Sequence, residues 1–141
     1  MQFDALFDCN AAFEGACEAL KSIQESGVTI HAASSWPSDY IQGALFGAEL
    51  APCITSMFGP DLVDCPKEGP EFYRLIFRSS EVPPSRAVVV DDLPECLRWA
   101  EEAGARVIQA CIKPGAPKPE FPLHIRKLSE LPAIVYRLAR S

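Results

Sequence analysis

The chain has 141 residues, of which 48% are hydrophobic and 23% charged, and its net charge at pH 7 is -6. This composition predicts one globular domain, residues 1–141, large enough to bury a core. The acidic balance excludes nucleic acid as a main partner, and no apolar run approaches the roughly 20 residues of a membrane span. The N-terminus lacks a signal-peptide pattern and the six cysteines form no CxxC pair, so we expect a cytoplasmic protein with free thiols, no zinc and no membrane partner.

The first half of the chain alternates helical and extended patterns. Residues 1–12 are ambiguous and fit either a short strand or the end of a helix. Apolar residues recur at helical spacing over residues 13–23, Gly27 ends that helix, and residues 28–33 (VTIHAA) are typical of a buried strand. The spacing then predicts a second helix that begins at Pro37 and ends before Gly47, followed by a connecting region, 51–63, with a short strand or turn.

The second half is organised around residues 86–108, RAVVVDDLPECLRWAEEAGARVI. Its apolar run at 87–90 predicts a strand buried on both faces, and a helix then runs from Pro94 to the stop at Gly104. A third helix begins before this stretch at Pro70, and after it come a new strand, a proline-rich loop at 110–127 and a C-terminal helix at 129–140. This alternation predicts an α/β fold, a Rossmann-like three-layer sandwich with a mostly parallel sheet.

Two adjacent carboxylates, Asp91 and Asp92, follow the buried strand at 87–90. In open α/β sheets, ligands bind beyond the carboxyl ends of the strands. Neighbouring carboxylates repel each other unless they are solvated, share a proton or hold a cation, and Mg²⁺ prefers oxygen ligands. The pair therefore indicates either a Mg²⁺ site or a helix start, in which Asp92 caps the helix and Asp91 favours its positive end.

Two further polar groups fall at comparable places. Ser34 ends the strand at 28–33, and Lys67 lies just ahead of the helix that begins at Pro70. Because parallel strands end at the same edge, the hydroxyl, the ammonium and the two acids can converge, which suits a phosphoryl group and Mg²⁺. The alternatives are that Ser34 only caps a helix and that Lys67 is a solvated surface lysine.

With these residues in order, the sequence resembles the haloacid dehalogenase superfamily of hydrolases, most of whose members are phosphatases. The resemblance covers roughly residues 13–108. GACEALKSIQESGVTIHAASS resembles the second motif, with Ser34 and the adjacent Ser35 as phosphate-binding residues; KEGPEFY resembles the third, with Lys67 as its lysine. VVVDDLPECLRWAEEAGARVI resembles the fourth in the variant with adjacent acids, Asp91 and Asp92. The resemblance implies a Rossmann-like core and Mg²⁺ on the fourth-motif acid.

The first motif of that family, DxDx(T/V), is absent from the sequence. Its first aspartate is the nucleophile and its second the general acid/base. One interpretation is a degenerate motif, FDCNAAF, with Asp8 as nucleophile and Asn10 in the acid/base position. The other, which the missing DxD pattern favours, is that the chain begins after the first motif and lacks both the central strand and a cap domain. An exposed edge left by a missing strand would favour pairing with a second copy, so a homodimer is expected.

The sequence thus predicts a Mg²⁺-dependent phosphatase for a small phosphorylated compound, with turnover impaired because its nucleophile motif is absent or degenerate. The alternative is a non-catalytic relative that binds phosphate-like ligands or a protein partner. A receiver-like module fits less well, since in receivers the acid pair comes near the start of the chain. His31, in the middle of a strand, is expected to be a core or edge histidine rather than a ligand.

Overall fold

The protein is described by a computed structural model that covers residues 3–8, 15–34, 51–112, 115–116 and 118–141. A six-stranded sheet has the order β3-β2-β1-β4-β5-β6, and each neighbouring pair is parallel. The strands are β1 (Asp4–Asp8), β2 (Thr29–Ala33), β3 (Ser56–Phe58), β4 (Ala87–Asp91), β5 (Arg106–Ala110) and β6 (His124–Ile125). The helices are α1 (Ala16–Glu25), α3 (Pro60–Val63), α4 (Pro70–Ser80), α5 (Pro94–Glu102) and α6 (Leu131–Ala139), with short 3-10 turns η1 (Ala51–Cys53), η2 (Pro84–Arg86) and η3 (Leu128–Glu130).

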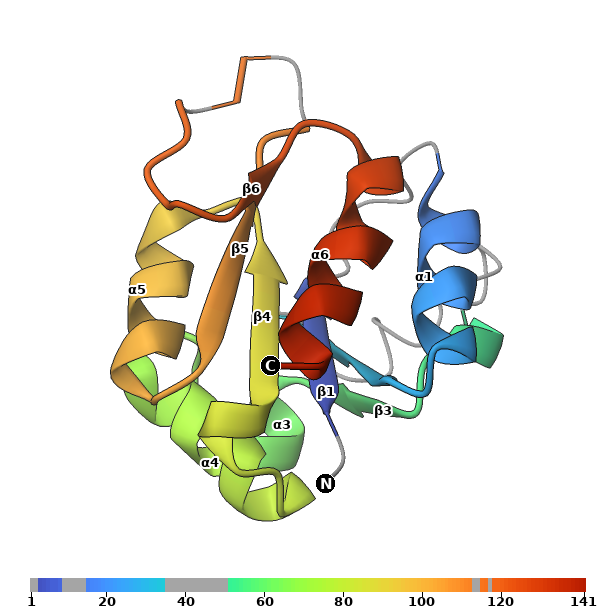
Figure 1. The fold of residues 1–141 in the computed structure, drawn as a ribbon. Coiled ribbons are helices and arrows are strands. Elements are labelled where there is room, and N and C mark those ends of the chain that lie inside the picture. The colour runs from blue at the N-terminus through green and yellow to red at the C-terminus, as the bar shows by residue number, and fades with distance from the viewer. Residues whose placement is uncertain (1–2, 9–14, 35–50, 113–114, 117) are drawn as a thin grey trace.

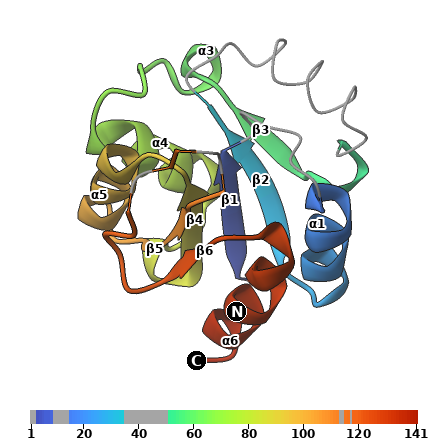
Figure 2. The same ribbon diagram turned by 90° about the horizontal axis from the view of Figure 1, so that it is seen from above.

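Helices cover both faces of the sheet, so the predicted three-layer α/β sandwich is confirmed (Figures 1 and 2). On one face, apolar side chains of α1 and α6 pack on the strands; on the other, those of α4 and α5 do. The central strands contribute to both cores because successive residues of a strand point to opposite faces. The run from Val88 to Val90 therefore has no polar residue, since neither face of β4 meets water.

The expectation that the central strand is missing is wrong. β1 lies between β2 and β4, with residues 4–8 paired to residues 29–33 and residues 4–7 paired to residues 87–90. Residues 1–12 were ambiguous because this strand is short and has an aspartate at each end, which a local pattern does not distinguish from a loop. The argument for a homodimer that rested on a missing strand loses its premise, because the centre of the sheet is filled.

Local sequence explains where several elements begin and end. Pro70 and Pro94 lie in the first turns of α4 and α5, where an amide has no helical partner to lose. Gly104 follows α5 with φ 99°, and a Cβ there would lie 3.0 Å from Cβ of Pro84, so glycine fits this tight turn into β5.

Other expectations have mixed outcomes. The helix predicted from Pro37 lies outside the described residues. The proline-rich loop contains a short strand, β6, that the sequence did not reveal, and it pairs with β5 through Gln109 and Ala110. Among the helices of the described residues, none combines the length and apolar character needed to cross a membrane.

Candidate active site

The carboxyl ends of the three central strands bring the predicted site residues to one edge of the sheet. Ser34 directly follows β2, Asp8 ends β1 and Asp91 ends β4. Asp8 is paired with Ala33, and the register that pairs residue 7 with residue 90 brings position 8 beside Asp91. Adjacent strands lie about 4.8 Å apart, so backbone positions 8, 33 and 91 fall within one small region.

Lys67 reaches this edge from the turn between α3 and α4. Its Nζ donates a hydrogen bond to Oδ2 of Asp91 at 3.0 Å, and the two side chains are only 5% and 1% exposed. A cation and an anion so far removed from water stabilise each other strongly, and either one alone would be costly to bury. The interpretation of Lys67 as a solvated surface lysine is therefore wrong.

Asp91 also fixes the turn that leads into α5. Its second carboxylate oxygen, Oδ1, accepts a hydrogen bond from the backbone N–H of Leu93 at 3.0 Å. Both oxygens of Asp91 are thus engaged by groups of this chain, while Asp92 is half-buried beside it. The two acids, predicted together as Mg²⁺ ligands, have different surroundings: Asp91 holds the lysine and the turn, and Asp92 is the more accessible carboxylate.

Tyr73 is a residue of this region that the sequence analysis missed. It is 1% exposed in the second turn of α4, and Nζ of Lys67 lies 6.0 Å from its ring centroid. A cation at that distance from an aromatic face is attracted by the ring quadrupole, so Tyr73 helps to hold the ammonium in place. The spacing of six residues between Lys67 and Tyr73, across a Gly-Pro helix start, was the signal available.

Ser34 is 1% exposed, and its backbone N–H donates to the carbonyl of Phe58 at the end of β3 at 3.1 Å. This bond continues the β2–β3 pairing and fixes Ser34 at the carboxyl edge. Ser35 and Asn10 lie outside the described residues, and of Asp8 only the backbone position is described. The phosphate-binding and nucleophile assignments remain predictions.

The chemistry of the donors at this edge fits a hard divalent cation. The half-buried Asp92 carries carboxylate oxygens, which Mg²⁺ prefers over nitrogen or sulfur, and backbone positions 91 and 8 lie at the same edge. Within the described part of the chain, no group of three or more potential ligand side chains gathers at one point. A metal would therefore depend on few carboxylates and on water, as is usual for Mg²⁺.

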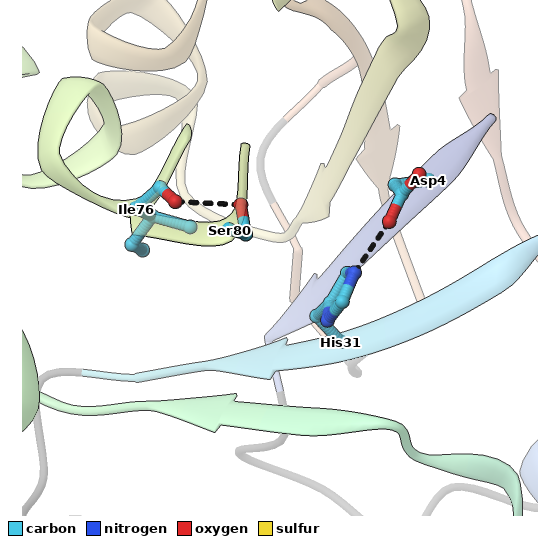
Figure 3. Close-up of polar contacts among 4 residues, drawn as sticks. All are labelled: Asp4, His31, Ile76 and Ser80. Carbon is cyan, nitrogen blue, oxygen red and sulfur yellow. Dashed lines mark hydrogen bonds and ion pairs between the residues drawn. The ribbon is translucent and has the colours of Figure 1, made fainter. Parts of the chain in front are cut away.

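A second buried polar pair lies away from this edge (Figure 3). Nε2 of His31 is 2.6 Å from Oδ2 of Asp4, the first residue of β1, and both side chains are about 5% exposed. The ring of His31 also lies 5.7 Å from that of Phe58. His31 is thus a core histidine, as expected, and it compensates the aspartate that made β1 hard to recognise.

No protein-family model matches the chain, but known proteins resemble it in sequence and in structure. Over 104 residues it is 32% identical to validoxylamine A 7'-phosphate phosphatase of Streptomyces hygroscopicus subsp. limoneus, an alignment that covers 72% of this chain and 49% of that protein. The chain spans about half the length of the curated relatives it matches.

Solved structures show the same architecture. A dehalogenase determined as an intermediate complex superposes with a TM-score of 0.77 at 23% identity, over 86% of this chain and 55% of that one. A HAD-family hydrolase from Deinococcus radiodurans R1, with bound phosphate and sodium, superposes with a TM-score of 0.75 at 23% identity, over 89% of this chain and 59% of that one. At these identities, the likeness establishes the fold.

Proposed function

The chain has the core fold of the haloacid dehalogenase superfamily, and on that premise we propose that it is the core of a phosphatase for a small phosphorylated compound. The observation that carries the proposal is the buried Lys67–Asp91 pair at the carboxyl edge, beside the strand end that holds Asp8. A lysine kept charged and out of water is suited to bind the oxygens of a phosphoryl group. The phosphatase named above, 32% identical, supports a phosphate ester as substrate.

In the proposed reaction, each group has one task. The ammonium of Lys67 and the hydroxyl of Ser34 hold phosphoryl oxygens. A carboxylate oxygen of Asp8 attacks phosphorus, a new O–P bond forms, and the bond from phosphorus to the ester oxygen breaks. The leaving alkoxide takes up a proton from water, and a water molecule then attacks the aspartyl-phosphate, which releases inorganic phosphate and regenerates the carboxylate.

Asp92 would be a ligand of Mg²⁺ in this proposal, and Asp8 would supply the second carboxylate. When bound, the ion would neutralise charge on the phosphoryl group. Asp91 has a different task, because its carboxylate accepts a hydrogen bond from Lys67 and holds the lysine in place.

Proton transfer to the leaving group is the step that this chain supports least. Asn10 stands where the superfamily's first motif has its general acid, and an amide has no proton to give to a leaving alkoxide. General acid catalysis contributes about 10²–10⁴-fold to rates. We therefore propose that turnover is impaired and that esters with good leaving groups, which need no proton, are cleaved fastest.

The test is phosphate release from p-nitrophenyl phosphate and from an alkyl phosphate, with and without Mg²⁺. Asn10→Asp is expected to raise the rate on the alkyl ester about 10²-fold and to change the aryl ester less. Asp8→Asn is expected to abolish both. Asp64→Asn is the matched control, because Asp64 is exposed and has φ 54°, which asparagine tolerates. Retained activity in Asp8→Asn, or full alkyl-ester activity in the unmodified chain, would contradict the assignment.

A second candidate is a binding protein without turnover, which Asn10 favours. In that case Lys67 and Ser34 bind a phosphorylated ligand and no phosphate is released by any variant, Asn10→Asp included. Calorimetric titration with inorganic phosphate separates the two: binding that is lost in Lys67→Met, without phosphate release in the assays above, supports the binding protein.

A further inference from the structure

A cavity of about 510 Å³ lies at the opposite edge of the sheet, where the strands begin. It is bounded by Phe3 ahead of β1, by the turn around Gly27 ahead of β2, by Arg86 ahead of β4, and by Tyr136 and Arg140 of the last turns of α6. Figures 1 and 2 show the start of β1 and the end of α6 at the same end of the molecule. The cavity is therefore separate from the Lys67–Asp91 edge, and the inference below does not rest on the proposed phosphatase activity.

The charged side chains that line the described part of the cavity are basic, although the chain is acidic overall. Two of its lining residues are arginines, and among the described residues that line it none is acidic. The guanidinium carbon of Arg86 lies 5.3 Å from the ring centroid of Phe3, and that of Arg140 lies 5.1 Å from the ring centroid of Tyr136. For Arg140, stacking on the ring restricts the guanidinium without using its N–H donors, so less entropy is lost when an anion binds.

The two arginines are not equivalent. Arg86 donates to the carbonyls of Ala139 and Ser141 at 3.3 and 3.4 Å, and so helps to hold the end of α6. Within the described residues, the guanidinium of Arg140 makes no hydrogen bond or ion pair besides its contact with Tyr136. Its planar fork of N–H groups matches two oxygens of a phosphate.

We propose that this cavity binds a small organic phosphate, with the phosphate hydrogen-bonded to Arg140 and attracted by the charge of Arg86, and with the organic group against Phe3 and Tyr136. Two fixed positive charges match the dianion of a phosphate monoester. The volume is within the range of small-molecule sites and far exceeds that of inorganic phosphate, so an organic group shares the cavity. Tyr136 is 47% exposed, which leaves ring surface for that group to cover.

The test is an NMR titration of the isotope-labelled chain with adenosine monophosphate in the absence of divalent cations. Resonances of the turn around Gly27 and of the end of α6 are expected to shift with a saturable dependence on concentration. Inorganic phosphate is expected to compete, and adenosine, which lacks the phosphate, is expected to cause no shift at these positions.

Substitutions distinguish binding at a specific site from attraction by the overall charge of the protein surface. Arg140→Gln is expected to weaken binding at least tenfold, about 1.4 kcal/mol, whereas Arg137→Gln, one turn earlier on the same helix, exposed and outside the cavity, is expected to change it less than twofold. Equal losses in the two arginine variants, equal binding of adenosine, or no shift at this edge would overturn the inference. Circular dichroism checks that each variant is folded.

Discussion

The buried ion pair at the carboxyl edge gives the sharpest test of the site. Asp91→Asn keeps the shape of the side chain and removes the negative charge that neutralises the ammonium of Lys67. Because these side chains are 1% and 5% exposed, water does not replace the lost partner. Asp92→Asn is the matched change on the next residue, which is half-buried.

The expected magnitude follows from this burial. Removing one partner of a buried ion pair costs about 3–5 kcal/mol, and Asp91→Asn also weakens the charge-assisted bond from the N–H of Leu93. Domain stabilities are about 5–15 kcal/mol, so the variant is expected to lose roughly a fifth or more of the free energy of unfolding. Asp92→Asn removes a favourable charge at the start of α5 and is expected to cost about 0.3–1 kcal/mol.

The assay is urea unfolding at neutral pH of the wild type, Asp91→Asn, Lys67→Met and the double variant. The double variant is expected to lose less than the sum of the single losses, because the second substitution removes the charge that the first left uncompensated. A second urea-unfolding series, with Mg²⁺ added, tests which of the two acids binds the metal. Mg²⁺ is expected to raise the free energy of unfolding of the wild type and of Asp91→Asn, and not that of Asp92→Asn.

Two results would refute this reasoning. If Asp91→Asn costs less than about 1 kcal/mol and the double variant is additive, the pair behaves as a solvated surface contact. If Mg²⁺ stabilises Asp92→Asn but not Asp91→Asn, then Asp91 is the metal ligand and the division of roles between the two acids is reversed.

Three further predictions follow from other parts of the molecule. Asp4→Val or His31→Leu alone is expected to lower the free energy of unfolding by about 3–5 kcal/mol, as measured by urea unfolding. The double variant is expected to lower it by much less, because replacing the whole buried pair with apolar groups leaves no uncompensated charge. Backbone N–H donors lower the pKa of Glu130, so its stabilisation is complete above the usual pKa of glutamate and is lost as the pH falls through the lower folded-state value. The difference in melting temperature between wild type and Glu130→Gln should therefore shrink as the pH is lowered below the usual pKa of glutamate; a constant difference would contradict it. Burial, with the nearby Cys17, raises the pKa of the Cys53 thiol, so mass spectrometry after iodoacetamide treatment at pH 7–8 should find exposed Cys17 labelled well before Cys53.

Much of the architecture could be predicted from the sequence because it depends on local pattern. The apolar run at 87–90, the prolines that begin α4 and α5 and the glycine after α5 each act within a few residues. The order of motifs also placed Ser34 and the two acids at strand ends, and parallel pairing alone then puts strand ends at one edge.

The place of β1 could not be predicted because it depends on residues far away in the chain. A five-residue strand that begins and ends with aspartate is unfavourable to bury on its own. It becomes the centre of the sheet because β2 and β4 pair with both of its sides, and because His31, 27 residues later, compensates Asp4. β6 was missed for a similar reason, since its two residues are held only by pairing with β5.

The sequence by itself determined the fold class, the motif order and the kinds of chemical group that gather at the carboxyl edge. Only the tertiary structure decided which acid holds Lys67, because a hydrogen bond across 24 residues distinguishes Asp91 from its neighbour where spacing does not. It also gathered two arginines from separate elements at the opposite edge. Both outcomes have one physical cause: contacts between distant segments determine which charged side chains lie close together, and sequence periodicity carries no information about that.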